Sequence, residues 1–91
     1  MNWPEWWSWE LELTPHMLKR MIDRQFNETD LRLMFERAMG CYEDFEEGRF
    51  VVETRHEGRA WAIIVEPSPE GRALIVVTAY PVERPREQGV I

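Results

Sequence analysis

Three apolar segments follow one another in the second half of the chain and constrain its fold more than any other feature. They cover residues 50–56, 60–66 and 73–80, and the breaks between them cover residues 57–59 and 67–72. Both breaks contain glycine, and the second also contains proline, so both are typical of turns. Breaks this short can join antiparallel strands but cannot cross over to make parallel ones. The sequence therefore predicts a three-stranded antiparallel meander.

The first half of the chain predicts one strand and then two helices. Apolar residues alternate with Ser8, Glu10 and Glu12 over residues 7–13, which indicates a half-buried strand. Thr14 can cap a helix and Pro15 suits its first position, so we expect a helix at 15–24. Its buried stripe is predicted to be Met17, Leu18, Met21 and Ile22.

A second helix is predicted after Asn27, which can act as its cap with Asp30 completing a partial capping box. Gly40 is a natural stop for this helix. The acidic stretch 41–49 is predicted to be an irregular connection. The residues predicted to form the buried stripe of this helix are Leu31, Met34, Phe35, Ala38 and Met39.

This order of elements predicts an α+β fold. It consists of an N-terminal strand and two helices that pack on one face of an antiparallel sheet, whose last three strands form the meander. A chain of 91 residues is large enough for one core only. We therefore expect a single domain at residues 1–82, followed by a mobile, charged tail at 83–91.

Composition narrows the class of protein. With 44% hydrophobic and 31% charged residues, and with no apolar run long enough to cross a bilayer, the chain is expected to be soluble and not to bind a membrane. Its start does not resemble a signal peptide, and the single Cys41 cannot form an internal disulfide, so a cytoplasmic location is expected. The net charge of −6 opposes nucleic-acid binding unless a local basic patch exists.

Neither a metal ion nor a cofactor is expected. His16 and His56 are forty positions apart in different predicted elements, and no spacing typical of metal ligands involves Cys41. The five glycines are scattered and form no phosphate-binding loop.

Candidate chemistry begins with His16, Arg20 and Arg24, which are four residues apart and would line one edge of the first helix. An imidazole can exchange protons near neutral pH, and guanidinium groups bind phosphate. Thr78 and Tyr80 would project together from the last strand, opposite Val77 and Ala79. Arg55 and Arg59 are further candidate cations. The alternative is an ordinary amphipathic helix with a solvated basic edge.

The tryptophan-rich start of the chain allows two interpretations. Trp3, Trp6 and Trp7 can form an exposed aromatic patch that binds a partner or a second copy of the chain. They can equally fold back over one end of the core.

Three segments together resemble a known family. The segment HMLKRMIDRQFNETDLRLMFERA, then FVVETRHEGRAWAIIVE, then LIVVTAYP resemble a family of small proteins similar to the BrnT and RelE toxins. The wider group contains barnase and the colicin E5 and colicin D ribonucleases. The resemblance covers about residues 13–81, and its most specific parts are His16 with Arg20 and Arg24, and the ending at residues 78–81.

The resemblance implies a metal-independent endoribonuclease of a toxin–antitoxin system, which cleaves RNA through a cyclic phosphate. The expected catalytic residues are His16, Arg20, Arg55 and Tyr80, with Arg24, Arg59 and Thr78 binding the substrate. The resemblance implies all of these except Arg59, which is a candidate as a cation only. The implied partners are RNA and an antitoxin protein. Two features depart from the family: Gln25-Phe26-Asn27 replaces Gly-Ile-Ser, and the chain is acidic where RelE-like toxins are basic.

A second hypothesis is a non-catalytic protein-binding module on the same fold, which engages its partner through the tryptophan-rich N-terminus. In that case the helix arginines would only pair with acidic neighbours such as Asp23 and Glu53. A third is a structural subunit that forms a homodimer through Trp3, Trp6 and Trp7.

Overall fold

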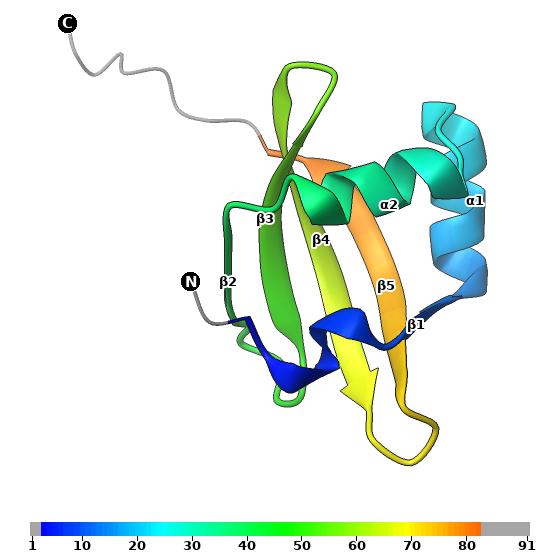
Figure 1. The fold of residues 1–91 in the computed structure, drawn as a ribbon. Helices are drawn as coiled ribbons and strands as arrows, with labels where there is room; N and C mark the ends of the chain where they lie inside the picture. The colour runs from blue at the N-terminus through cyan, green and yellow to red at the C-terminus, as the bar shows by residue number, and fades with distance from the viewer. Residues whose placement is uncertain (1–2, 83–91) are drawn as a thin grey trace, which may run out of the picture.

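The meander forms as predicted and makes up the centre of a five-stranded sheet. A computed structural model describes residues 3–82. The sheet order is β1-β5-β4-β3-β2 (Figure 1). The elements are η1 (Glu5–Ser8), β1 (Glu10–Leu13), α1 (Pro15–Arg24), α2 (Glu28–Glu36), β2 (Gly40–Glu43), β3 (Phe50–His56), β4 (Arg59–Ser68) and β5 (Ala73–Pro81). The fold class is therefore α+β, with both helices packed against the sheet.

A tight turn of two residues joins the first two strands of the meander, and residues 69–72 join β4 to β5. β3 and β4 are connected by Glu57 and Gly58, both with positive φ, at 52° and 76°. A two-residue turn with both φ values positive matches the twist of the strands on either side. β4 is longer than predicted and runs through Pro67 to Ser68.

The N-terminal strand is shorter than predicted and lies in an unexpected direction. Residues 5–8 form the 3₁₀-helix η1, in which the Trp7 N–H donates to the Pro4 carbonyl, so the strand begins only at Glu10. β1 pairs with β5 in parallel, with Leu11 opposite Leu74, while the other strand pairs are antiparallel. The alternation of Leu11 and Leu13 toward the core holds, because both pack against the main hydrophobic cluster.

β2 corrects the prediction that residues 41–49 are only a connection. Gly40–Glu43 pair antiparallel with β3, with Cys41 opposite Val52 and Tyr42 opposite Val51. The acidic residues that follow make the turn of this hairpin, where the Asp44 N–H donates to the Arg49 carbonyl. β2 forms because the backbone of β3 offers N–H and C=O groups for pairing. Local sequence patterns do not reveal this distant partner.

α1 begins as predicted, but its buried stripe is different. The Thr14 hydroxyl accepts a hydrogen bond from the Met17 N–H, and Pro15 occupies the first turn. Met17 and Met21 are buried, whereas Leu18 and Ile22 are 49% and 75% exposed. The predicted stripe is therefore half wrong. The helix is turned so that Met17 and Met21 face the core, while His16 at its exposed edge contacts Thr78 of β5.

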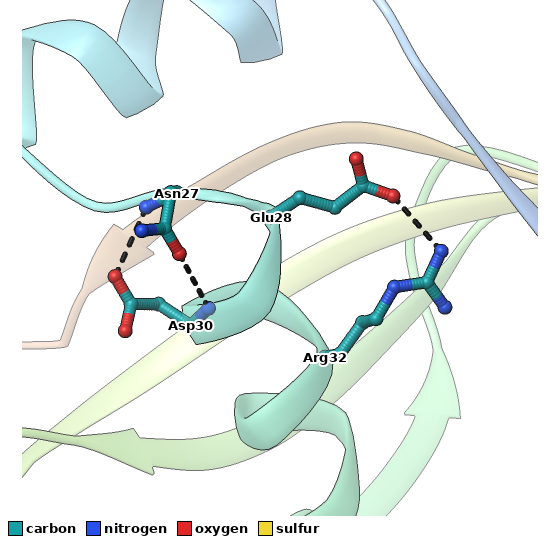
Figure 2. A network of polar contacts seen from close by, with 4 residues as sticks. All are labelled: Asn27, Glu28, Asp30 and Arg32. Atoms are coloured by element: carbon teal, nitrogen blue, oxygen red, sulfur yellow. Dashed lines mark hydrogen bonds and ion pairs between the residues drawn. The ribbon is translucent and has the colours of Figure 1, made fainter.

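α2 has the predicted capping box, which Figure 2 shows. The Asp30 N–H donates to the Asn27 side chain, and the Asn27 N–H donates to the Asp30 carboxylate. Leu31 and Met34 are buried as expected. The helix ends at Glu36, four residues before the predicted stop at Gly40, so Met39 lies outside it and is exposed.

The sheet has one covered face and one open face. The main core lies between the helices, η1 and the sheet, and its largest buried side chains include Val52, Ile63 and Leu74. Buried Thr54 on this side donates to the Met34 carbonyl and ties β3 to α2. On the opposite face, called here the outer face, Val51, Ala62 and Ile64 form a second small cluster with Val77. Figure 1 shows the helices on the same side of the sheet.

The predicted tail at residues 83–91 lies outside the described residues. Within residues 3–82, no helix has the length and apolar character needed to cross a bilayer.

Candidate functional site

The first helix and the last strand meet along a line that we call the α1–β5 seam, defined by His16, Arg20 and Thr78. Thr14 fixes the start of this seam with three hydrogen bonds. Its hydroxyl accepts from the Met17 N–H and donates to the Val77 carbonyl at 2.9 Å, and its own N–H donates to the Val76 carbonyl. The helix cap is thus also the anchor that holds α1 against β5.

His16 is held in the seam by one contact to the last strand. Its Nε2 atom lies 3.1 Å from Thr78 Oγ1, at hydrogen-bonding distance. The tautomer decides which group donates: a protonated Nε2 donates to the hydroxyl, and an unprotonated one accepts from it. The ring is exposed and Thr78 is half-buried, so the pair is open to a molecule in solution.

An irregularity in β5 sets which side chains face the seam. The pairing with β4 shifts between Ile64 and Val65, so Ile64 is opposite Thr78 and Val65 is opposite Val76. Val77 is the extra residue of this bulge and packs in the outer-face cluster. This corrects the prediction that Val77 lies opposite Thr78 and Tyr80, because a bulge breaks the simple alternation.

The two arginines of α1 follow His16 along the helix. Arg20 is half-buried and Arg24 is exposed, and within residues 3–82 no ion pair involves either side chain. α1 and β5 run side by side in the same direction (Figure 1). The rise along α1 from His16 to Arg20 is about 6 Å, and the rise along β5 from Thr78 to Tyr80 is similar. Arg20 and Tyr80 therefore lie at about the same height beyond the His16–Thr78 contact.

Arg55 and Arg59 lie elsewhere in the sheet. Arg55 is paired with Ala60 next to the β3–β4 turn, where its guanidinium donates to the Gly58 carbonyl at 3.2 Å. β4 separates β3 from β5, so Arg55 is two strands, or about 10 Å, to the side of Thr78. The structure therefore does not bring these two arginines to His16.

Tyr80 projects into a hollow on the outer face, which we call the outer trough. Its volume is about 430 Å³. The residues that line it are Tyr42, Glu43, Asp44, Phe45, Val51, Ala62, Tyr80 and Val82. Partial burial, the carboxylates of Glu53 and Asp44 and the phenol of Tyr80 together raise the pKa of Tyr42. The trough is thus aromatic, apolar and negatively charged.

The tryptophans pack against one another and against the core. Trp3 stacks on Trp7 with ring centroids 4.4 Å apart, Trp6 lies 5.1 Å from Phe50, and Trp7 meets Phe35 edge to face. Trp3, Trp6 and Trp7 are each half-buried. Of the two interpretations, the packing of Trp6 and Trp7 matches the one in which they cover one end of the core.

The other two candidates for chemistry, His56 and Cys41, are packed among other side chains. His56 packs with Phe26 and Trp61, with ring centroids 5.5 Å from each. Burial raises the pKa of the Cys41 thiol, which makes it a weaker nucleophile. Among residues 3–82, no group of three or more histidine, cysteine, aspartate or glutamate side chains is arranged to hold a metal ion.

Sequence reasoning missed the outer trough and the anchoring role of Thr14. The two consecutive hydrophobic residues Cys41 and Tyr42 were the only local signal for β2, and hence for the wall of the trough that Tyr42 makes. No local signal exists for the bond from Thr14 to the Val77 carbonyl, because the two residues are 63 positions apart. Comparison with family models, with curated proteins and with solved structures finds no match to this chain.

Proposed function

We propose that the protein is a metal-independent endoribonuclease of the toxin type, with its site in the α1–β5 seam. The observation that supports this most is the contact between His16 Nε2 and Thr78 Oγ1. It joins the two short motifs that carry the resemblance to the ribonuclease toxins, although 62 positions separate them. If α1 were only an ordinary amphipathic helix, a contact between its one histidine and a hydroxyl of the last strand would have no role.

The proposed reaction is the attack of a ribose 2′-oxygen on the adjacent phosphorus. His16 accepts the 2′-hydroxyl proton as the oxygen–phosphorus bond forms, and Thr78 orients the imidazole for this step. The bond to the 5′-oxygen breaks, leaving a 2′,3′-cyclic phosphate, and the Tyr80 phenol supplies the proton that the departing oxygen needs. Arg20 stabilises the charge that builds on the phosphate, and Arg24 extends this basic edge along the RNA.

Charge decides from which side the RNA would approach. In α1, Lys19 pairs with the single acidic residue Asp23. Arg20 and Arg24 therefore make one edge of this helix locally basic in a chain of net charge −6. The outer trough beyond Tyr80 carries the carboxylate of Asp44, and the Glu53 carboxylate acts on Tyr42 in its wall; both repel phosphate. The RNA backbone would therefore lie along α1 and not across the outer face.

The test compares growth of cells and their total RNA after induced expression of the wild-type chain and of His16→Ala, Arg20→Ala and Tyr80→Phe. Lys19→Ala is the matched control, because it removes an exposed cation from the same helix that pairs with Asp23 instead of facing the seam. We expect growth arrest and RNA fragments from the wild type and from Lys19→Ala. The His16→Ala, Arg20→Ala and Tyr80→Phe variants should lose both effects while remaining folded.

Intact RNA and normal growth with folded wild-type protein would contradict the proposal. RNA fragments that persist with His16→Ala would show that the seam is not the site of cleavage. The first result would favour the non-catalytic binding module. The second would place cleavage at a surface that does not involve His16.

A further inference from the structure

β2 is an edge strand with one free side. Within residues 3–82 its only strand partner is β3. The Asp44 N–H donates toward β3, and the direction of backbone groups alternates along an antiparallel strand. The N–H and C=O groups of Cys41 and Glu43 therefore point away from β3. They form a short row of pairing groups that an added strand can use.

A hollow lies on each face of the sheet beside this edge. The outer trough is one of them, with Tyr42 and Glu43 in its wall. The second hollow, of about 460 Å³, is lined by Trp3, Pro4, Gly40, Cys41, Tyr42, Glu43 and Phe50. Phe50 and Cys41 pack against the main core, which places this second hollow on the helix side. Successive side chains of an added strand point to opposite faces, so each hollow would receive alternate residues.

The two hollows differ in chemistry. The outer trough combines Tyr42, Tyr80 and the fully exposed Phe45 with the carboxylate of Asp44. Glu53 adds a second carboxylate on this side, because its Oε1 lies beside Gly40 of β2 and its charge acts on Tyr42. Glu43 is opposite Phe50, so its side chain is at the rim of the helix-side hollow. The helix-side hollow is mainly apolar, and no basic side chain among the described residues lines either hollow.

From these observations we propose that the β2 edge binds an extended segment of a partner protein in which basic and apolar side chains alternate. The backbone of the segment pairs with Cys41 and Glu43. Its basic side chains lie over the aromatic rings of the outer trough, where carboxylates and cation–π contacts stabilise a positive charge. Its apolar side chains enter the hollow between Trp3 and Phe50.

Charge argues against a second copy of this chain as the occupant. Two copies paired through β2 would bring together two sets of Glu43, Asp44 and Glu53, in molecules that each carry a net charge of −6. Like charges placed opposite one another across a strand pair are destabilising. A basic segment meets the same surface with opposite charge.

The probes are two short capped peptides, one alternating lysine with valine and one alternating glutamate with valine. Amide resonances and amide hydrogen exchange of the full-length protein are followed as each peptide is added, up to about 1 mM. We expect the lysine peptide to shift resonances at residues 40–45 and to protect the Glu43 amide from exchange. The glutamate peptide should bind at least about tenfold more weakly.

Two substitutions at one position separate backbone pairing from charge. Glu43→Gln removes one carboxylate and keeps the N–H, whereas Glu43→Pro removes both. Proline is tolerated in an edge strand where its nitrogen faces solvent, so the fold should survive in both variants. We expect Glu43→Gln to weaken binding by about threefold and Glu43→Pro by about tenfold or more relative to Glu43→Gln.

Three outcomes would overturn the proposal. The first is the absence of shifts with the lysine peptide. The second is equal binding by Glu43→Pro and Glu43→Gln, which would exclude pairing along β2. The third is a concentration-dependent dimer in sedimentation that Glu43→Pro abolishes, because a second copy would then be the occupant. None of these measurements depends on cleavage of RNA.

Discussion

His16 Nε2 lies 3.1 Å from Thr78 Oγ1, and this contact connects the first turn of α1 to the last strand of the sheet. It requires Thr14 to hold the helix start against the Val76 and Val77 carbonyls. It also requires the bulge at Val77, which sets the direction of the Thr78 side chain. The candidate site thus depends on a helix cap and on an irregularity of the sheet.

The hydroxyl of Thr78 should matter more for cleavage than its bulk. Thr78→Val keeps the shape of the side chain but cannot hydrogen-bond to His16, so RNA cleavage should fall by about tenfold or more. Thr78→Ser retains the hydroxyl and should keep most of the activity. Cleavage of a labelled RNA by the purified variants measures both. Equal loss in the two variants would mean that Thr78 acts through packing and not through the imidazole.

Thr14 should contribute more stability than an ordinary helix cap. Thr14→Ala removes the acceptor for the Met17 N–H and the donor to the Val77 carbonyl, which should cost about 1–2 kcal/mol of the free energy of unfolding. Thr14→Ser retains both bonds and serves as the control. Urea unfolding at neutral pH measures the difference. A loss below about 1 kcal/mol in Thr14→Ala, which is typical of an ordinary cap, would show that the bond to β5 adds nothing.

Truncation of two adjacent residues of α1 should change the free energy of unfolding by very different amounts. Met17 is fully buried, so Met17→Ala should lower the free energy of unfolding by about 2–5 kcal/mol. Leu18 is 49% exposed, and Leu18→Ala should change it by no more than about 0.5 kcal/mol. Chemical unfolding of both variants tests how the helix is turned. Comparable losses would indicate that the originally predicted stripe, including Leu18, is buried after all.

Tyr42 should make the protein less stable in alkaline solution. Its pKa is raised in the folded state by partial burial and by Glu53, Tyr80 and Asp44, so the folded state favours the neutral phenol more than the unfolded state does. Stability from this group is present below the unfolded pKa of about 10 and is lost as the pH rises through the folded value.

The measurement is urea unfolding of the wild type and of Tyr42→Phe at about pH 8 and about pH 11. Tyr42→Phe should lose less stability between the two pH values, because it has no phenol to ionise at this position. An identical loss in both chains would mean that neither burial nor the neighbouring charges raise the pKa of Tyr42 in the folded state.

The segments with strong local signals are those that the sequence alone could predict. Thr14 with Pro15, and Asn27 with Asp30, start the two helices where expected, because capping bonds form between residues only three positions apart. The breaks at 57–59 and 67–72 require antiparallel pairing for steric reasons, so the meander follows from the sequence. Met17 and Met21 are buried as their spacing indicates.

Tertiary structure decided what depends on distant partners. Cys41 and Tyr42 form a strand because β3 offers an edge, and Leu18 is exposed because Thr14 turns α1 against β5. The meeting of His16 and Thr78, and the separation of both from Arg55, follow from strand order and a bulge. Local spacing places side chains on one face of one element, but only the packing of elements determines which faces meet.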